Sequence, residues 1–489
     1  MIRLDASARS LDALERYGLD TLLDASCLLR VEDPDADVVE LRIGDTRGSC
    51  TVPDAIANDW FIGDEAGRVV VERAAVRLVA EIVGAVAEQR SAARDRFDRV
   101  PSSENPLVAA DAERDPVVSR AAQRLRVAAM RAAGSRPFRT LAPWPGGHRW
   151  AVALTHDLDV VEWWPAFTGL RIAELAKARE WRELARVAGS AVRNAFGDPV
   201  LDAVNRVLAT EAGSAARSTW FLLCGTPTLR TVARGDLTYR PEAAATRRIV
   251  SRIRDGGHEI GLHGSFATLE SAQAFQEQSR RLGALGECGV TGVRQHYLRM
   301  RPGTTHRAME AAGFEYDATY GFPDRNGFRL GIADVVPRWD DASQRPSALR
   351  EVPLTWMDRA LSKYQGVMDP DRWIDDALAL AGTVRDVGGV WVGLWHPNLA
   401  TPLGFPRALD AYDRLVRELF AAQPWGASLS EIVAWRDARR AVRALRVDAD
   451  GVVQLAPQPA AAAIVLENAA GERAPTAVTS ETRAAHSLE

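Results

Sequence analysis

From Ala151 onward, short apolar segments alternate with segments of helical periodicity, and this alternation constrains the fold more than any other feature. The apolar segments have the length of strands and begin at Ala151, Ser218, Glu259, Gly292, Arg350 and Val390. Between them, residues 243–257 and 270–286 are predicted to be helices, each followed or closed by glycine. This order indicates α/β layers around a largely parallel sheet or barrel, with functional residues at the C-terminal ends of the strands.

The chain of 489 residues is too long for one ordinary core, which indicates two or three domains. Prolines and glycines gather in residues 136–150, so we place a boundary near residue 145. Residues 1–145 are predicted to form an α/β domain of unknown role, with helical periodicity in 67–90 and 115–133. Residues 146–440 form the large domain, and 441–489 a small β appendage with a disordered tail from Glu472.

The charge and hydropathy patterns restrict the partners. A net charge of -4 gives no basic field for nucleic acid or an anionic membrane surface. The N-terminal sequence lacks the apolar run of a signal peptide, and no apolar stretch is long enough to span a membrane, so we expect a cytoplasmic protein. The cysteines are scattered without zinc-site spacing, and we expect buried free thiols at Cys27, Cys50, Cys224 and Cys288.

The first chemical motif follows the strand that begins at Ala151 and runs from Thr155 to Asp159. If the extended geometry continues, Asp157 and Asp159 point to the same side, because strand side chains alternate. One carboxylate can then hold a metal while the other accepts a proton from water. A cap of a helix or turn is the alternative role for such a pair.

Two histidines, His258 and His263, bracket the strand that begins at Glu259. Their odd separation places them on opposite faces, so at most one enters a shared site. In the next strand, Arg294 and His296 have even spacing, and an arginine there can clamp a carboxylate in bidentate fashion. Hydrogen-bonded structural histidines and a surface ion pair remain the alternatives.

His396 follows the strand that begins at Val390 and precedes Pro397, which ends the strand. This is where α/β proteins build their sites, although a hydrogen-bonded core histidine is also compatible with the pattern.

Taken in order, these motifs resemble those of the polysaccharide deacetylases, carbohydrate esterase family four, over roughly residues 147–436. The resemblance implies a distorted barrel, usually of seven β/α units, whose members use a divalent metal to remove acyl groups from sugar amides. By position, Asp157 is then the general base, His396 the general acid and Arg294 the residue that holds Asp157. The backbone near Tyr297 would stabilise the oxyanion, and Tyr297 and Trp395 are the expected substrate-binding residues.

The metal ligands depart from the family pattern. In the family pattern the metal-binding aspartate directly follows the base, but this sequence has Leu158 at that position. Asp159 must therefore bind the metal instead, as in the DxD members of the family. The first metal histidine corresponds to His263, but the second corresponds to Ala267. Parity disfavours His258, and we therefore predict that His296 completes a site with Asp159 and His263. The expected metal is zinc, with cobalt or nickel as alternatives.

The predicted function is metal-dependent removal of an N-acyl group, most simply acetyl, from an amino-sugar glycan or glycan precursor. The predicted partner is thus an N-acylated sugar. Two alternatives stay open: hydrolysis of a small cyclic amide in the same fold, and a catalytically degenerate protein that binds glycan or scaffolds an assembly. Ala267 favours the degenerate protein, whereas Asp157, Arg294 and His396 favour catalysis.

Overall fold

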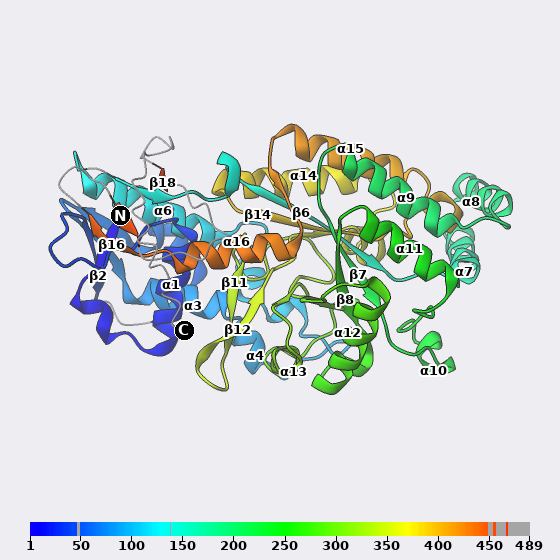
Figure 1. The fold of residues 1–489 in the computed structure, drawn as a ribbon, viewed down its shortest axis with the longest axis horizontal. Helices are drawn as coiled ribbons and strands as arrows, with labels where there is room; N and C mark the ends of the chain where they lie inside the picture. Colours follow the sequence, from blue (N-terminus) through cyan, green and yellow to red (C-terminus); the bar gives the residue numbers. More distant parts are fainter. Residues whose placement is uncertain (46–48, 137, 448–452, 456–465, 468–489) are drawn as a thin grey trace, which may run out of the picture. The chain divides into compact units, whose positions relative to one another are not determined.

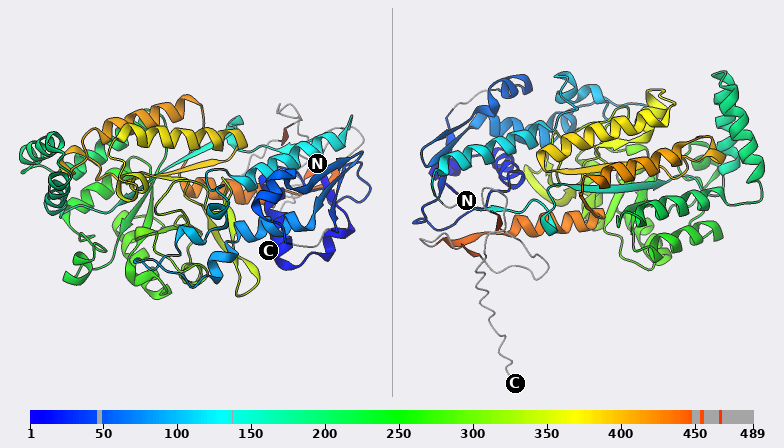
Figure 2. Two further views of the ribbon diagram at one scale, coloured as in Figure 1. Left: turned by 180° about the vertical axis from the view of Figure 1, so that it is seen from behind. Right: turned by 90° about the horizontal axis from the view of Figure 1, so that it is seen from above.

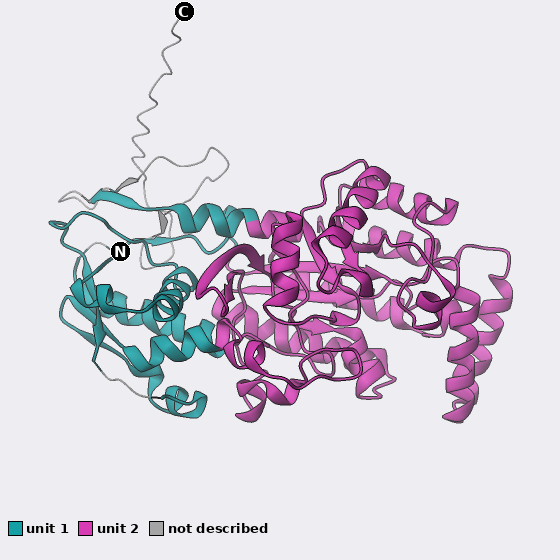
Figure 3. Ribbon diagram, turned by 90° about the horizontal axis from the view of Figure 1, so that it is seen from below, with its two compact units in different colours: residues 1–81, 117–148, 434–489 teal, residues 82–116, 149–433 magenta. Residues whose placement is uncertain are grey.

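The computed structural model describes residues 1–489 except 46–48, 137, 448–452, 456–465 and 468–489, so the expected disordered tail lies outside the described residues. The chain divides into two compact units, shown in Figure 3. Unit 1 contains residues 1–81, 117–148 and 434–489, and unit 2 contains residues 82–116 and 149–433. The boundary after His148 lies close to the expected one. However, residues 82–116 group with the large unit and residues 434–440 with the small one.

Unit 1 is built on a mixed sheet in the order β1-β2-β4-β3. These strands are β1 (Ile2–Leu4), β2 (Val39–Gly44), β3 (Ile62–Glu65) and β4 (Arg68–Glu72). The other helices and strands of this unit are α1 (Ala13–Ala25), α2 (Val52–Ala57), α6 (Val117–Ala133), β5 (Thr140–Leu141), β16 (Ala444–Val447), β17 (Val453–Leu455) and β18 (Leu466–Glu467). Two helices are divided between the units, α3 (Arg73–Val83) after residue 81 and α16 (Leu429–Ala441) after residue 433.

The helical prediction for residues 67–90 is wrong at its start. Arg68–Glu72 forms β4, which pairs in parallel with β2, and the helix begins only at Arg73. The three consecutive valines of this segment favour a strand because β-branched side chains pack well on a pleated surface. The prediction for residues 115–133 agrees with α6.

Unit 2 contains the predicted parallel sheet. Its described strands follow the order β11-β12-β10-β9-β8-β7-β6-β14-β13, with β15 also paired to β6. All neighbours run parallel except β11 and β12. The strands are β6 (Ala151–Leu158), β7 (Thr219–Leu223), β8 (Glu259–Gly264), β9 (Gly292–Gln295), β10 (Tyr316–Asp317), β11 (Val336–Asp340), β12 (Arg345–Glu351), β13 (Trp356–Met357), β14 (Val390–Trp395) and β15 (Trp425–Gly426).

The expected distorted barrel is open on one side, because no pairing among the described strands joins β11 or β12 to β13. Residues 352–355 cross this gap as irregular chain. The Leu354 N–H donates to Tyr320 O at 3.0 Å, and the Thr355 N–H donates to Val392 O at 3.0 Å. Single hydrogen bonds therefore replace a strand pair at this point of the sheet.

Helices cover the outside of the sheet in the same order as the strands, as Figures 1 and 2 show. Contacts run from α13 to α12, α11, α9, α15 and α14 in turn. The central strand β6 is buried along all eight residues, as expected for a parallel strand covered on both faces. These helices are α9 (Pro199–Ala212), α11 (Ala244–Asp255), α12 (Ala272–Gly286), α13 (Thr304–Ala312), α14 (Pro370–Val387) and α15 (Ala408–Ala421).

The other helices of unit 2 are α4 (Val86–Arg90), α5 (Pro106–Ala109), α7 (Trp164–Lys177), α8 (Trp181–Arg193) and α10 (Leu229–Ala233). Within the described part of the chain, no helix combines the length and apolar character needed to cross a membrane. The cysteine prediction holds for Cys27 and Cys224, which are free and buried, but is wrong for Cys288, which is exposed, and for the half-buried Cys50.

A buried ionisable cluster supports the strand ends at β10. His306 Nε2 lies 3.4 Å from Asp317 Oδ2 and 3.3 Å from Glu351 Oε2. His306 Nδ1 accepts hydrogen bonds from the Gly303 N–H and from Arg338 Nε, so a neutral ring carries its proton on Nε2, facing the carboxylates. The three side chains could be near enough for a metal, but this proton position favours a proton-sharing cluster.

The cluster is linked to the carboxyl edge of the sheet. Asp317 Oδ1 accepts from the Thr319 N–H at 2.9 Å, and Thr319 Oγ1 accepts from the Gln295 N–H at 3.0 Å. Burial raises the pKa of Glu351 to about 7, with a further contribution from the charge of Asp317. Glu351 therefore binds a proton more tightly in the folded protein than in the unfolded chain.

The first prediction concerns stability against pH. A carboxyl pKa raised from 4.5 to about 7 contributes stability below 4.5 that is lost as pH rises through 7. In the wild type, the free energy of unfolding should therefore fall between mildly acidic and mildly alkaline pH. In Glu351→Gln, which mimics the protonated acid, we expect this fall to be smaller by about 2 kcal/mol. Urea unfolding at both pH values measures it. Glu315→Gln, at an exposed position, is the control; equal pH dependence in both variants would contradict the assignment.

Candidate active site

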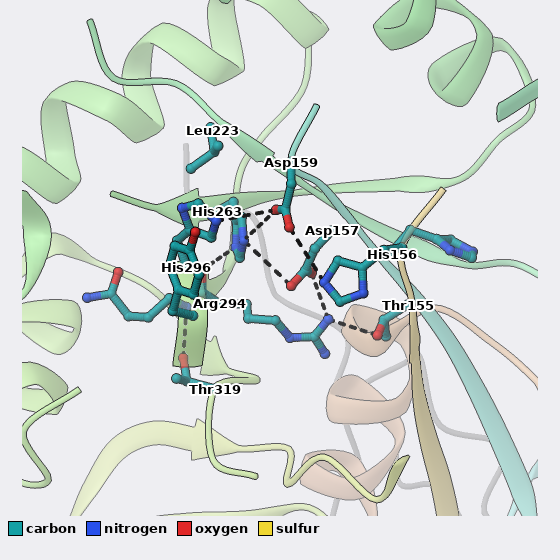
Figure 4. Close-up of polar contacts among 12 residues, drawn as sticks. Thr155, His156, Asp157, Asp159, Leu223, His263, Arg294, His296 and Thr319 are labelled. Atoms are coloured by element: carbon teal, nitrogen blue, oxygen red, sulfur yellow. Dashed lines mark hydrogen bonds and ion pairs between the residues drawn. The ribbon is translucent and has the colours of Figure 1, made fainter. Parts of the chain in front are cut away.

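The strand β6 and the residue after it deliver the paired carboxylates to the carboxyl edge of the sheet. The extended backbone continues through Leu158, so Thr155 and Asp157 lie on one face. His156 lies on the other, where its Nδ1 contacts Trp395 O at 3.0 Å and its Nε2 contacts Glu211 Oε1 at 2.7 Å. Figure 4 shows Asp157 and Asp159 directed toward the same group of side chains.

Arg294 of β9 holds Asp157, as the sequence predicted, but through one nitrogen. Its Nη1 lies 3.0 Å from Asp157 Oδ1 and also donates to Thr155 Oγ1 at 2.8 Å, while Nε donates to Ala318 O at 2.9 Å. The expected bidentate clamp is thus wrong, because the guanidinium is shared among three acceptors. Arg294 is fully buried and Asp157 nearly so, and an ion pair this well buried is disrupted only at a large cost.

His263 lies at the end of β8 beside both aspartates. Its Nδ1 donates to Arg294 O at 2.9 Å, which leaves Nε2 as the free nitrogen. This nitrogen lies 3.4 Å from Asp159 Oδ1 and 3.5 Å from Asp157 Oδ2. Burial lowers the pKa of His263, but the charges of Asp157 and Asp159 outweigh burial and raise it.

His296 approaches the same point from the turn that follows β9. Its Nε2 lies 3.6 Å from Asp159 Oδ1, and its ring centroid lies 4.9 Å from that of His263. The strand ends at Gln295, and Tyr297 has a left-handed φ of 60°, so a tight turn rather than a continued strand places His296 here. Ala267 is exposed in the turn after β8.

Asp159, His263 and His296 fit a divalent metal. Their candidate ligand atoms lie within 4.8 Å of one another, and two imidazoles with one carboxylate form a donor set that zinc uses in catalytic sites. Asp159 Oδ1 is buried and has no hydrogen-bond partner among the described residues. Burial opposes the charged form of Asp159, yet the surrounding His296, His263 and His396 hold its pKa well below the usual range.

His396 stands opposite, at the end of β14, with Nε2 3.6 Å from Asp159 Oδ2. Its Nδ1 bonds to Asp358 Oδ1 at 2.7 Å, and its backbone N–H donates to Asp358 Oδ2 at 2.7 Å. Burial lowers the pKa of His396, but Asp358, assisted by the charges of Asp159 and Asp157, outweighs burial and raises it. The imidazolium form is therefore stabilised, with Nε2 free to face a ligand.

A cavity of about 370 Å³ opens above these residues, and its described lining belongs to unit 2. Asp157, Asp159, His263, His296 and His396 form its polar end. The remaining wall is largely apolar and includes Val160, Trp163, Phe167, Leu170, Leu298 and Met357. The size lies within the range of small-molecule pockets.

Tyr297 lines this cavity, whereas Trp395 does not. The prediction that Trp395 binds substrate is wrong, because its side chain is 2% exposed and packs in the core beside Trp356 and Tyr412. Trp395 directly precedes His396, so its side chain points to the opposite face of the sheet, which helices cover.

Sequence reasoning missed Asp358, although its signal was present. Asp358 directly follows the short strand β13, so the strand-end rule that identified Asp157 also applies to it. Reasoning also missed Asp236, whose Oδ1 lies 3.7 Å from His296 Nδ1. No local pattern marks Asp236, because it follows the short helix α10 in an irregular segment.

Comparisons with family models and with curated proteins gave no match. Several solved structures are similar. One, from Mycobacterium smegmatis and assigned as a polysaccharide deacetylase, is 21% identical over 62% of this chain and 95% of its own, with a TM-score of 0.41. The peptidoglycan deacetylase PdaC from Bacillus subtilis is 14% identical over 60% of this chain and 94% of its own, with a TM-score of 0.29.

A pseudoenzyme of carbohydrate esterase family four from Bacillus anthracis is also similar, at 13% identity over 58% of this chain and 65% of its own, with a TM-score of 0.25.

The second prediction concerns the ligand set. Replacing His296 by Ala removes one of three ligand atoms, so we expect the zinc affinity of the full chain to fall by more than about 100-fold. Competition with a chromophoric chelator measures this affinity. His148→Ala, outside the cavity, serves as the matched control. If the two variants bound zinc equally well, His296 would not be a ligand.

Proposed function

We propose that this chain is a metal-dependent hydrolase that removes an N-acyl group, most simply acetyl, from an amino sugar. The observation that carries the proposal is the convergence in one cavity of three groups. These are a carboxylate paired with a buried arginine, a cluster of one carboxylate and two imidazoles, and a histidine backed by a carboxylate.

The metal that Asp159, His263 and His296 would hold supplies Lewis-acid polarisation of the amide carbonyl and lowers the pKa of water. Asp157 accepts the proton from the attacking water. Arg294 Nη1 holds that carboxylate at 3.0 Å, so its second oxygen stays turned toward the metal cluster.

His396 then donates its Nε2 proton to the amide nitrogen as the carbon–nitrogen bond breaks. The products are an amino sugar, protonated on nitrogen, and a carboxylate. Asp358 orients the imidazole and stabilises its charged form, which a general acid near neutral pH requires. The cavity of about 370 Å³ favours one or two sugar rings over a long chain lying in an open groove.

The direct experiment is acetate release from N-acetylated mono- and oligosaccharides by zinc-, cobalt- or nickel-loaded protein. Allantoin, a small cyclic amide, belongs in the same panel because the two substrate classes share the bond that is cleaved. Release of acetate from the sugars supports the proposal, and turnover of allantoin alone would replace it with the cyclic-amide function. Metal binding without turnover of any substrate would favour a binding protein.

The third prediction is that Asp157→Asn abolishes acetate release, a loss of at least about 100-fold, while zinc affinity changes little. The amide cannot accept the proton, whereas Asp159 still offers its carboxylate to the metal. Turnover and chelator competition on the same preparation separate the two effects. Activity close to that of the wild type would exclude Asp157 as the base.

The fourth prediction is that Asp358→Asn lowers kcat by about 10- to 100-fold with little change in KM. Because Asp358 raises the pKa of His396, its loss should also move the alkaline limb of the pH profile to lower pH. Asp375→Asn, at an exposed position on α14, is the matched control. An unmoved pH profile would show that Asp358 does not act through His396.

A further inference from the structure

Two cations in the wall of the catalytic cavity lack an anionic partner. Among the described residues, no carboxylate oxygen forms an ion pair with Arg359 or Lys363, although both line the cavity. Lys363 Nζ lies 5.0 Å from the centroid of the Tyr297 ring, and Arg359 Cζ lies 5.2 Å from that of Phe405. The hydrogen bond of Arg359 to Ser362 Oγ is long, at 3.4 Å.

A third cation of this wall, Arg99, shows the contrasting arrangement. Its Nη2 lies 2.6 Å from Asp95 Oδ2, and its Nη1 donates to Tyr297 O at 2.8 Å. Arg99 is therefore neutralised within the fold and holds the turn that carries His296. Among the described residues, Arg359 and Lys363 make no such contact with a carboxylate.

The carboxylates of the site make their direct contacts with other groups. Asp157 is paired with Arg294, and Asp358 bonds to His396. Asp159 faces the two metal-cluster imidazoles. The charges of Asp358 and Asp159 act on the two cations only from a longer distance, so neither cation has a direct ion pair among the described residues.

The pKa values agree with the absence of direct ion pairs. Partial burial, together with the charge of Arg359, lowers the pKa of Lys363 to about 8. Burial also lowers the pKa of Arg359, and the charges of Asp358 and Asp159 offset this effect only in part. A bound anion in contact with both side chains would stabilise their charged forms.

The composition of the chain sets Lys363 apart as well. Of the 61 lysine and arginine residues, only Lys177 and Lys363 are lysines. Lys177 lies exposed on α7, so Lys363 is the only lysine at the cavity. The π-helical turn Ala360–Tyr364 that carries it is a rare conformation, often found at functional sites.

We infer that Arg359 and Lys363 form an anion subsite that binds a carboxylate or phosphate substituent of the N-acyl sugar, so that the substrate class is acidic amino sugars. This inference rests on the proposed function for the identity of the sugar. A guanidinium and an ammonium together suit either anion, since the first offers paired donors and the second a point charge. The metal cluster and this subsite lie in the same cavity, so one sugar can reach both.

The test compares three sugars that share the N-acetyl group and differ in charge. They are N-acetylglucosamine, which is neutral, N-acetylmuramic acid, which carries a carboxylate, and N-acetylglucosamine 1-phosphate. Their affinities for the zinc-loaded full chain are measured by calorimetry in the Asp157→Asn background, so that turnover does not interfere. We expect at least one charged sugar to bind about tenfold more tightly than the neutral one, and the better of the two identifies the anion.

Lys363→Met is the informative variant, because the partly covered side chain lies at the cavity wall outside the core and methionine preserves contact with Tyr297. We expect it to weaken binding of the charged sugar by about fivefold to tenfold and to leave the neutral sugar unaffected. Lys177→Met, the same change at the other lysine, should alter neither.

Equal affinity for the three sugars, or no binding of any, would overturn the anion subsite. Equal weakening of charged and neutral sugars in Lys363→Met would also overturn it, because that result indicates packing and not charge. Acetate release by the wild type separates this outcome from failure of the proposed function. Acetate release without a charge preference would support the hydrolase function and refute the anion subsite. Charge-selective binding without acetate release would support the anion subsite and refute the hydrolase function.

Discussion

The buried ion pair between Arg294 and Asp157 is the contact on which the rest of the site depends. The two residues come from β9 and β6, which are separated in the sheet by β7 and β8, so their side chains meet only because the sheet curls. A guanidinium buried this completely requires a carboxylate partner, since an unpaired charge in the interior is strongly destabilising. The curvature of the sheet and the position of the proposed base are thus stabilised by the same interaction.

Arg294 also positions its neighbours through the backbone and the rest of its side chain. Its carbonyl accepts the Nδ1 proton of His263 and thereby frees Nε2 for the metal cluster, while its Nε is held by Ala318 O. The Asp317, Glu351 and His306 cluster lies next to this anchor and connects through Thr319 to the backbone of Gln295. The ionisable residues behind the sheet therefore support the residue that organises its carboxyl edge.

The histidines differ in what their ring nitrogens contact, and this difference decides what each can do. Both nitrogens of His156 are engaged by protein oxygens, so it has no lone pair or proton to offer a ligand. His263 and His396 each use Nδ1 in the fold and present Nε2 to the cavity. A carboxylate or carbonyl behind each imidazole fixes its tautomer, which is how proteins prepare metal ligands and general acids.

The sequence by itself determined the alternation of strands and helices and the strand-end location of Arg294 and His396. It also determined the position of Asp157 on the inner face of β6, because side-chain direction along a strand follows from its period of two. It also disfavoured His258 by parity, and this histidine contacts Ser218 away from the metal cluster. Only the tertiary structure decided the rest. The tight turn after β9 brings His296 to Asp159. From the chain after β12, Asp358 reaches His396 and Lys363 reaches the cavity, and residues 352–355 leave the sheet open. These features depend on how distant segments curl around a common interior, and no local pattern of residues encodes that curvature.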